Sequence, residues 1–313
     1  MLPRGSILTR MLPLLAALAI GAVIPIQTAA NSRLRLSVGG FPAVSALVSF
    51  TVAFAVSIAV TAVITGTVLP DFAATAREPW WVWTGGAMGV LFVMGNILLF
   101  PRIGAVQTVV LPILGQVVMG LAIDHFGLFR APQMDVGLGR IAGAVVVLAG
   151  IALVLGLGRG KTDTGARGAW GWRVLGVGIG MTSALQTTIN GHLGSVAGSS
   201  LHASEISLGV GVLLILALAL ATAPRQLVTA PTPGPWWMWL GGIIGAAFVI
   251  GGARLAPILG TATTVIAFNA GTIAGGQAME SMGWFGAKRL RMDAIRLAGL
   301  AMIFLGVVAV RLF

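Results

Sequence analysis

Long apolar runs dominate this chain of 313 residues and are separated by short polar stretches. A membrane-spanning helix needs about 20 consecutive apolar residues. A membrane-spanning strand would alternate apolar and polar positions, and these runs do not alternate. The pattern predicts an all-α integral membrane protein with ten transmembrane helices, at residues 11–30, 43–66, 81–100, 103–123, 138–158, 172–190, 201–222, 237–255, 258–279 and 293–312.

The runs also belong to an internal repeat, which is the first feature to seek in a long chain. Residues 79–86 read PWWVWTGG and return at 235–242 as PWWMWLGG, an offset of 236 − 80 = 156. Upstream, Gln27 and Asn31 return as Gln186 and Asn190, at an offset of 186 − 27 = 159. The offset of 156 also pairs Phe92 with Phe248, Gly104 with Gly260, Asp124 with Glu280 and Arg140 with Arg296.

The repeat predicts how the chain is organised. A first five-helix repeat covers residues 1–158, a polar and Gly-rich linker covers 159–171, and a second five-helix repeat covers 172–313. Because five is odd, the two halves begin on opposite sides of the membrane and form inverted repeats. This is a common design of secondary transporters, which bind substrate at the repeat interface near the bilayer midplane.

Composition supports the membrane assignment and removes several classes of function. Only 9% of residues are charged, against about 25% in soluble domains. The net charge of +11 is spread in small groups between apolar runs, which favours the lipid surface over nucleic acid as the partner. Cysteine is absent and the three histidines lack metal-ligand spacing, so we expect no metal, no cofactor and, since enzyme motifs are missing, no enzyme.

The basic residues also predict an orientation. With ten spans both termini lie on one face, and twelve of the 19 Lys and Arg residues fall on the other face together with the linker. The positive-inside rule then places the linker in the cytoplasm and both termini outside.

Several motifs resemble a known family. Residues 115–129 read GQVVMGLAIDHFGLF, and with Arg140, Gly143 and the stretch QTAAN at 27–31 they are similar to the YdcZ-type inner-membrane exporters of the drug/metabolite transporter superfamily. The resemblance covers nearly the whole chain and implies a fused two-repeat exporter of the bacterial inner membrane. The second half departs from the motif, with Thr272 in the place of Gln116 and Ser281 in the place of His125.

Polar side chains within apolar runs are candidates for a transport site, since they are costly in lipid. Gln27 and Asn31 share one helix face at a spacing of four residues, and Gln186 and Asn190 repeat this arrangement. The alternative is that the Asn residues cap helix ends and the Gln residues hold helices together. The candidate substrate-binding set is Gln27, Asn31, Asn96, Gln107, Gln116, Gln186, Asn190, Glu205, Asn269 and Thr272.

The acids fall into two groups. Asp124 and Glu280 each precede an arginine by 16 residues, Arg140 or Arg296, and we interpret them as structural ion pairs at helix ends; a proton relay is the alternative. Glu205, whose counterpart at the offset of 159 is Ala46, lies inside an apolar run. It is either a proton- or cation-binding carboxylate or a side chain that reaches the interface.

The sequence therefore predicts a secondary transporter that exports a small molecule by alternating access, with proton or cation coupling as one option. A membrane-embedded enzyme acting on lipid and a non-transporting scaffold remain alternatives. The protein is expected to be a monomer or a homodimer. Substrate, coupling ion and direction do not follow from these residues.

Overall fold

The computed structural model describes residues 7–156, 169–287, 289 and 292–312. Within them the chain is helical throughout, and no strand occurs in these ranges. The predicted linker at 159–171 lies largely outside the described residues. The longer helices are α1 (Ile7–Ser37), α2 (Pro42–Thr65), α4 (Gly85–Phe126), α5 (Leu138–Val154), α6 (Ala169–Val196), α7 (Ser200–Thr222), α8 (Leu240–Leu259), α9 (Thr261–Met282) and α10 (Ala294–Leu312), with a short α3 (Phe72–Thr75) on a loop.

The prediction of ten spans is not confirmed by length and hydropathy. Seven segments of the described chain are long and apolar enough to cross a membrane, and two of these come from α4. Helix α5 is apolar but has only 17 residues, and α6 and α9 are not among the seven. Helix α9 carries many polar residues and is buried from Thr261 to Gly271. Other helices surround it there, so apolar side chains are not needed on every face.

Helix α4 contains two of the predicted segments and folds back on itself. A straight helix of its 42 residues would be about 63 Å long at 1.5 Å per residue. Yet Trp81, just before α4, and Phe129, just after it, have ring centroids 5.3 Å apart. Leu99 and Leu111 both lie close to Gly176 of α6. The chain therefore reverses between two arms, which match the candidate spans Trp80–Leu99 and Gln107–Phe126.

The second half repeats this hairpin with a sharper turn. Helices α8 and α9 meet at Gly260, whose φ of 84° and ψ of 157° suit glycine. Trp237 and Phe285, the counterparts of Trp81 and Phe129, again meet edge to face, at 5.6 Å. The loops that follow the two hairpins also agree, since Gly127 and Gly283 both end a helix in the left-handed conformation.

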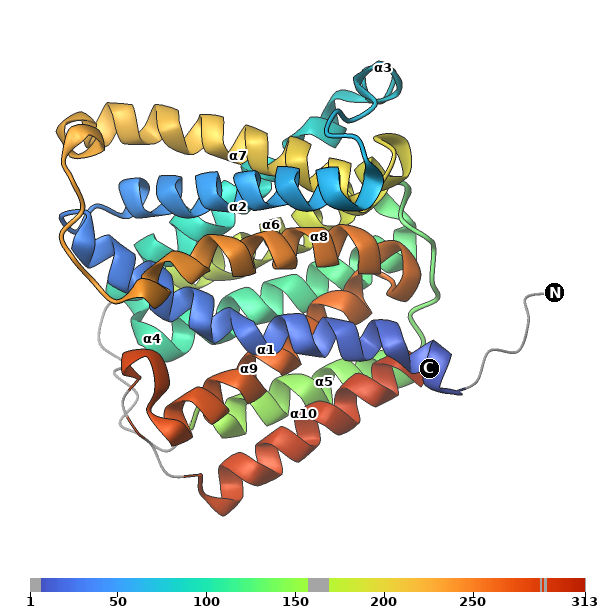
Figure 1. The fold of residues 1–313 in the computed structure, drawn as a ribbon. Coiled ribbons are helices and arrows are strands. Elements are labelled where there is room, and N and C mark those ends of the chain that lie inside the picture. The colour runs from blue at the N-terminus through green and yellow to red at the C-terminus, as the bar shows by residue number, and fades with distance from the viewer. Residues whose placement is uncertain (1–6, 157–168, 288, 290–291, 313) are drawn as a thin grey trace.

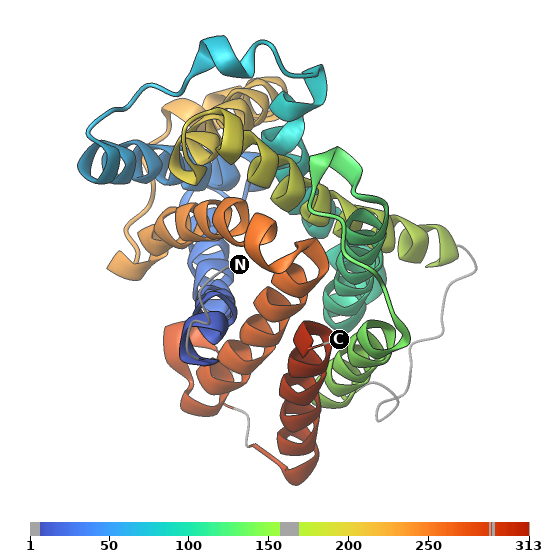
Figure 2. The same cartoon turned by 90° about the vertical axis from the view of Figure 1, so that its right-hand side faces the viewer.

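The helices pack in pairs that the repeat relates to one another. Helix α4 packs along α6, and α1 packs correspondingly along α8 and α9. Helix α2 packs on α7 and α5 packs on α10, and both pairs are visible in Figures 1 and 2. Glycines let α5 and α10 approach closely, because Gly143 lies against Gly306 and Gly150 against Gly299.

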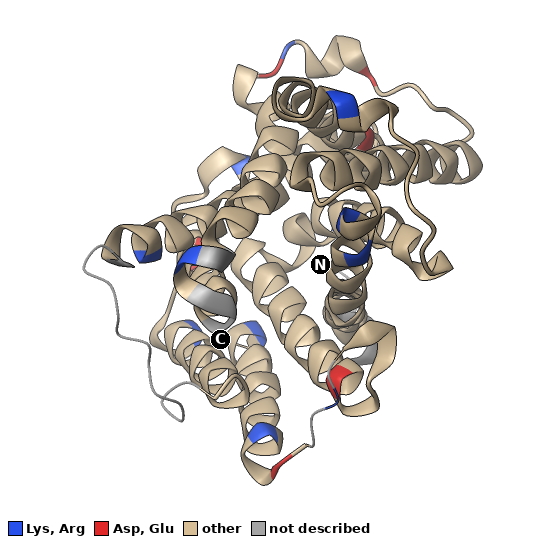
Figure 3. Ribbon diagram, turned by 90° about the vertical axis from the view of Figure 1, so that its left-hand side faces the viewer, with Lys and Arg blue, Asp and Glu red and all other residues tan. Residues whose placement is uncertain are grey.

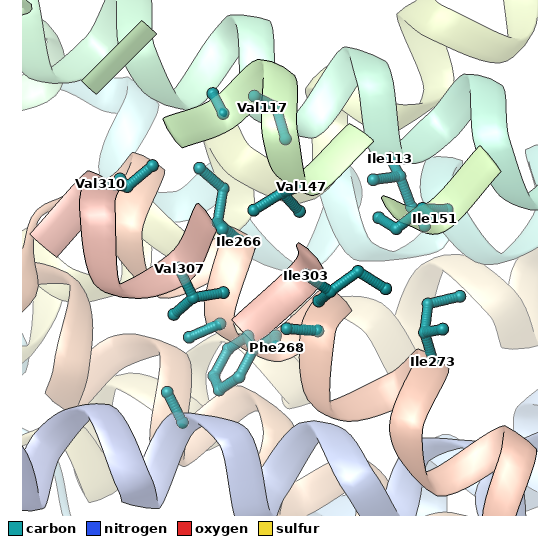
Figure 4. Close-up of a cluster of buried hydrophobic side chains, with 14 of the residues drawn as sticks. Ile113, Val117, Val147, Ile151, Ile266, Phe268, Ile273, Ile303, Val307 and Val310 are labelled. Carbon is teal, nitrogen blue, oxygen red and sulfur yellow. The ribbon is translucent and has the colours of Figure 1, made fainter. Parts of the chain in front are cut away.

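The largest cluster of buried apolar side chains joins α4, α5, α9 and α10, with α1 at its edge (Figure 4). Charged residues are sparse along the ribbon (Figure 3).

The start of α1 and the end of α10 lie at the right of Figure 1, and we call this the termini face. The opposite face, where α5 ends, α6 begins and α4 reverses, is called the linker face.

Candidate functional site

A cavity of about 400 Å³ lies between the two halves of the molecule. Its walls come from α1, α2, α4, α6, α7, α8 and α9. Buried Gln116, Gln186 and Asn269 lie at its inner end, whereas Thr28, Ser32 and Arg35 line it toward the end of α1, with Thr28 and Arg35 exposed. Because the exposed lining residues follow α1 toward its C-terminal end, the cavity opens toward the linker face.

Seven of the ten predicted substrate-binding residues line this cavity. At the inner end the Asn269 Nδ2 atom donates a hydrogen bond of 3.3 Å to Gln116 Oε1. The Ser49 hydroxyl donates to Asn31 Oδ1 at 3.0 Å, and Asn96 Nδ2 donates to the Phe92 carbonyl at 2.9 Å. The seven are Gln27, Asn31, Asn96, Gln116, Gln186, Asn269 and Thr272.

Glycines position the four amides that the repeat relates. A Cβ atom at Gly241 would lie 2.0 Å from Asn31 Oδ1, and one at Gly85 would lie 2.1 Å from Asn190 Oδ1. One turn further on, Gly245 faces Gln27 and Gly89 faces Gln186. Each half therefore seats its amides against the glycines of the other half. The amides both join helices and, at three of the four positions, line the cavity.

The remaining three predicted residues lie elsewhere. Gln107 accepts a hydrogen bond of 3.0 Å from Arg173 Nε. Asn190 is buried, and its Oδ1 atom has no hydrogen-bond partner among the described residues. Glu205 does not line the cavity. These three side chains therefore lie outside the cavity lining, and their part in substrate binding stays a prediction.

Glu205 lies at the buried contact between α7 and α2. It is 4% exposed, and neither carboxylate oxygen makes a well-formed hydrogen bond within the described chain, although the Thr61 hydroxyl lies close enough to the carboxyl group to interact with it. One residue before it, the Ser204 hydroxyl pairs with that of Ser57 on α2 at 2.6 Å. The Thr61 hydroxyl, also on α2, donates to the Ser57 carbonyl at 2.7 Å. An interfacial side chain would be exposed, so that alternative for Glu205 does not fit.

The contacts also correct the counterpart of Glu205 in the first half. Ser49 lies beside Gly241, and Ser207 lies beside Gly85 in the same way. In these helices the offset is therefore 207 − 49 = 158. The counterpart of Glu205 is then Leu47 and not Ala46.

The cavity has two features that the sequence analysis missed. Four phenylalanines from different helices line it, at Phe50, Phe92, Phe248 and Phe268. Phe92 and Phe248 recur in the repeat, and that recurrence was the available signal. Arg35 also lines the cavity, but no local pattern separates it from the other loop arginines.

The termini face is closed by a buried clamp around Asp124. The carboxylate accepts the backbone N–H of Thr261 at 2.7 Å and that of Ala262 at 3.2 Å. It also accepts Arg140 Nη2 at 2.8 Å, and both side chains are almost wholly buried. A carboxylate is favoured at the first turn of a helix such as α9, where N–H groups lack partners. Asp124 of the first half therefore fixes the turn at Gly260 in the second.

The equivalent pair on the linker face is looser. Glu280 and Arg296 are 3.7 Å apart, with side chains 36% and 24% exposed. Gln277 bridges them, donating to Glu280 and accepting from Arg296, each at 3.3 Å. Within the described chain, these polar contacts of Glu280 stay in the second half. The cavity is thus shut on the face where the clamp is made and open on the other.

Comparison with known proteins agrees with this architecture. No curated protein matches the sequence. A crystal structure with 17% sequence identity shares the fold, with a TM-score of 0.66 over 98% of both chains. The family model described as "Putative inner membrane exporter, YdcZ" matches the chain twice, at residues 12–153 and 171–309. With both halves matched, the chain belongs to the YdcZ family of multi-pass inner-membrane transporters.

Proposed function

We propose that this protein exports a small molecule across the inner membrane by alternating access, with the central cavity as its transport site. The observation that carries the proposal is the pairing of an amide-lined cavity, open to one face, with a buried clamp that shuts the other face. Transporters of inverted-repeat design bind their substrates at such a repeat interface. The family description of the chain favours export as the direction.

Ten spans are part of the proposal. Helices α5, α6 and α9 would cross the membrane with the seven segments that meet the apolar criterion. The halves would then be inverted repeats, residues 1–158 and 172–313 with the linker at 159–171 between them. The α5–α10 contact supports a pseudo-two-fold axis. Gly143 and Gly299 are repeat counterparts, as are Gly150 and Gly306. Gly143 packs against Gly306, and Gly150 packs against Gly299, as a two-fold axis between the helices requires.

The cycle follows from exchanging the two clamps. In the state opposite to this one, Glu280 would hold the reversal of α4 as Asp124 now holds the start of α9. Arg296 would then take the place of Arg140, whose Nη2 atom lies 3.5 Å from the Thr263 hydroxyl. The counterpart of Thr263 is Gln107, now bonded to Arg173. Opening one face and closing the other would then be one rearrangement.

Coupling to a proton or cation belongs to the same proposal, with Glu205 as the group concerned. A buried carboxylate whose polar neighbours are neutral hydroxyls, such as that of Thr61, is stable there only with a proton or a cation. The titratable group that acts on it is His202 on the same helix, and α2 carries none. The Glu205→Gln variant should transport with no pH dependence; an unchanged pH profile would remove Glu205 from the coupling step.

The basic residues favour a cytoplasmic linker and external termini, which would make the present state open to the cytoplasm. That is the state in which an exporter loads. A monomer or a homodimer would serve equally, since all lining residues come from one chain. A C-terminal reporter that is active only in the cytoplasm would reverse the assignment if it gave signal.

A flux measurement separates transport from lipid chemistry and from a scaffold role. Proteoliposomes are loaded with a mixture of metabolites, and the released solutes are identified by mass spectrometry. The wild type should release particular solutes. The Thr28→Trp variant, which puts an indole into the exposed part of the cavity, should release none. The Leu15→Trp variant, on an exposed part of the same helix, is the matched control.

Lipid turnover without solute release would favour the enzyme. If neither turnover nor release occurs, the scaffold alternative gains and the transport proposal fails. Release that is equal for Thr28→Trp and the wild type would show that solutes leave by a route other than this cavity.

A further inference from the structure

The charge of the cavity wall restricts what the cavity can hold. Among the described residues its polar groups are neutral amides and hydroxyls, and its one charged residue is Arg35. The acids in the described chain all lie outside the lining: Asp71, Glu78, Asp124, Asp135, Glu205, Glu280 and Asp293. A cation would therefore find no counter-charge inside.

The apolar part of the wall favours a ring-shaped or branched body. Phe50, Phe92, Phe248 and Phe268 reach the cavity from α2, α4, α8 and α9. The rings of Phe248 and Phe268 touch, with centroids 5.0 Å apart at an angle of 43°. Offset and tilted aromatic contacts of this kind also suit a flat ligand ring. A volume of about 400 Å³ is at the small end of ligand pockets, which are about 300–1,000 Å³.

Aromatic faces also attract cations, so two effects must be weighed. A cation is attracted to the face of a Phe ring, but only weakly. Moving an ammonium group from water into a site without a counter-charge costs considerably more free energy, even after relaxation. The cost exceeds the gain. An anion has the same cost, but it is offset by the Arg35 guanidinium and by amide N–H donors.

We propose that the occupant of the cavity is a small aromatic carboxylic acid, with its ring beside Phe50 and Phe92 and its carboxylate toward Arg35. This rests on the proposed function in one respect, the use of the cavity as the transport site. Arg35 is exposed near the end of α1, so it would meet the acid first and hold it while the ring enters.

Three compounds with one body and different charges test the proposal. They are 3-phenylpropanoate, 3-phenylpropanamide and 3-phenylpropylamine, titrated calorimetrically into the purified full-length protein in nanodiscs at neutral pH. The acid should bind about tenfold more tightly than the amide, the size expected for one charge-assisted contact. The amine should bind more weakly than both.

Two arginine variants assign the effect. Arg35→Gln should lower the affinity for the acid to that for the amide, and it should leave the affinity for the amide unchanged. Arg33→Gln is the matched control, because Arg33 is on the same helix and does not line the cavity. Phe92→Leu should weaken acid and amide by the same factor. Thermal unfolding of each variant verifies that the fold is intact.

The proposal is overturned if the amine binds as tightly as the acid, if Arg35→Gln keeps the preference, or if none of the three compounds binds. These results are distinguishable from failure of the transport proposal. Binding that depends on Arg35 without any flux would leave the ligand class standing and remove transport. Flux of cationic solutes through the cavity would support transport and overturn the proposed ligand class.

Discussion

Two acid–arginine pairs occupy equivalent places in the repeat and make different contacts. Asp124 and Arg140 are buried at 2.8 Å, and the carboxylate also holds two backbone N–H groups of α9. Glu280 and Arg296 are 3.7 Å apart, partly exposed, and bridged by Gln277. The same 16-residue spacing therefore supports a clamp across the two halves in one case and a loose local pair in the other.

The difference coincides with the state of each face. The cavity is closed where Asp124 holds the turn at Gly260 and open where Glu280 is not engaged. If the two pairs only stabilised their hairpins, their distances and burial should be similar. Under the proposed alternating access each pair would act as a gate, with the Asp124 gate shut and the Glu280 gate open in this state.

The largest effect is expected for Asp124→Asn. The change leaves Arg140 buried without a counter-charge, which should reduce the free energy of unfolding by about 3–5 kcal/mol. Glu280→Gln, at the exposed pair, should cost about 0–1 kcal/mol. Equilibrium unfolding of both variants in the same detergent measures the contrast. Equal losses of unfolding free energy would mean that the two pairs stabilise the fold to the same extent.

Gly260→Ala tests the turn that Asp124 holds. A backbone conformation with φ of 84° and ψ of 157° costs a non-glycine residue about 1–3 kcal/mol. The added Cβ would also lie 2.8 Å from Asp124 Oδ2. Gly66→Ala should cost less, since Gly66 has φ of 73° and ψ of 0°, a left-handed conformation that other residues tolerate better, and nothing lies within 4 Å of the added Cβ. If both variants lose the same stability, neither the conformation of Gly260 nor its contact with Asp124 makes this turn special.

Reversing the charges should separate the two pairs further. Glu280→Arg with Arg296→Glu keeps an ion pair and should unfold within about 1 kcal/mol of the wild type. Asp124→Arg with Arg140→Asp places a cation against the N–H groups of Thr261 and Ala262, so the reversed pair should not recover stability. If the reversed Asp124–Arg140 pair recovered as much stability as the reversed Glu280–Arg296 pair, the contacts of Asp124 with the backbone N–H groups would be dispensable.

The smallest effect is expected for Glu205→Gln. Both acids are buried, but Asp124 has three donors and Glu205 makes no well-formed hydrogen bond among the described residues. Replacing this carboxyl by an amide of the same shape leaves an oxygen for the Thr61 hydroxyl, so the melting temperature should not fall. A large loss of stability would mean that Glu205 is ionised and paired in the folded protein.

The sequence predicted the helices better than it predicted the site. Apolar runs and the repeat predicted the helices of both halves and seven of the lining residues, because each depends on local spacing. That Glu205 lies outside the cavity could not be predicted, because its position depends on how α7 packs on α2. Arg35 was missed, because only the fold shows that the end of α1 borders the cavity.

The asymmetry of the two clamps could not be predicted from the sequence, for a different reason. A repeated motif encodes equivalent contacts, and it carries no sign of which contact is formed in a given state. The repeat therefore predicted that Asp124–Arg140 and Glu280–Arg296 would be alike. Ten apolar runs also predicted ten spans, whereas seven segments of the described residues meet the criterion of length and hydropathy. One of the helices outside the seven, α9, is largely buried by protein and does not need an apolar surface.

The most direct test of the exchange uses two cysteines. The chain has no native cysteine, and Thr28 and Thr187 are repeat counterparts. Each hydroxyl donates to the carbonyl four residues before it, at 3.2 Å and 3.0 Å. Thr28 is exposed and lines the cavity, whereas Thr187 is 3% exposed. The labelling rates of Thr28→Cys and Thr187→Cys are measured with a membrane-impermeant thiol reagent applied to each side of oriented vesicles.

The account predicts that Thr28→Cys reacts only from the linker face and that Thr187→Cys is protected. Adding Asp124→Asn should expose Thr187→Cys to the termini face and slow the labelling of Thr28→Cys by a matching amount. The account is contradicted if both cysteines react from the same face, or if loosening the Asp124 clamp exposes Thr187→Cys while the labelling of Thr28→Cys stays unchanged.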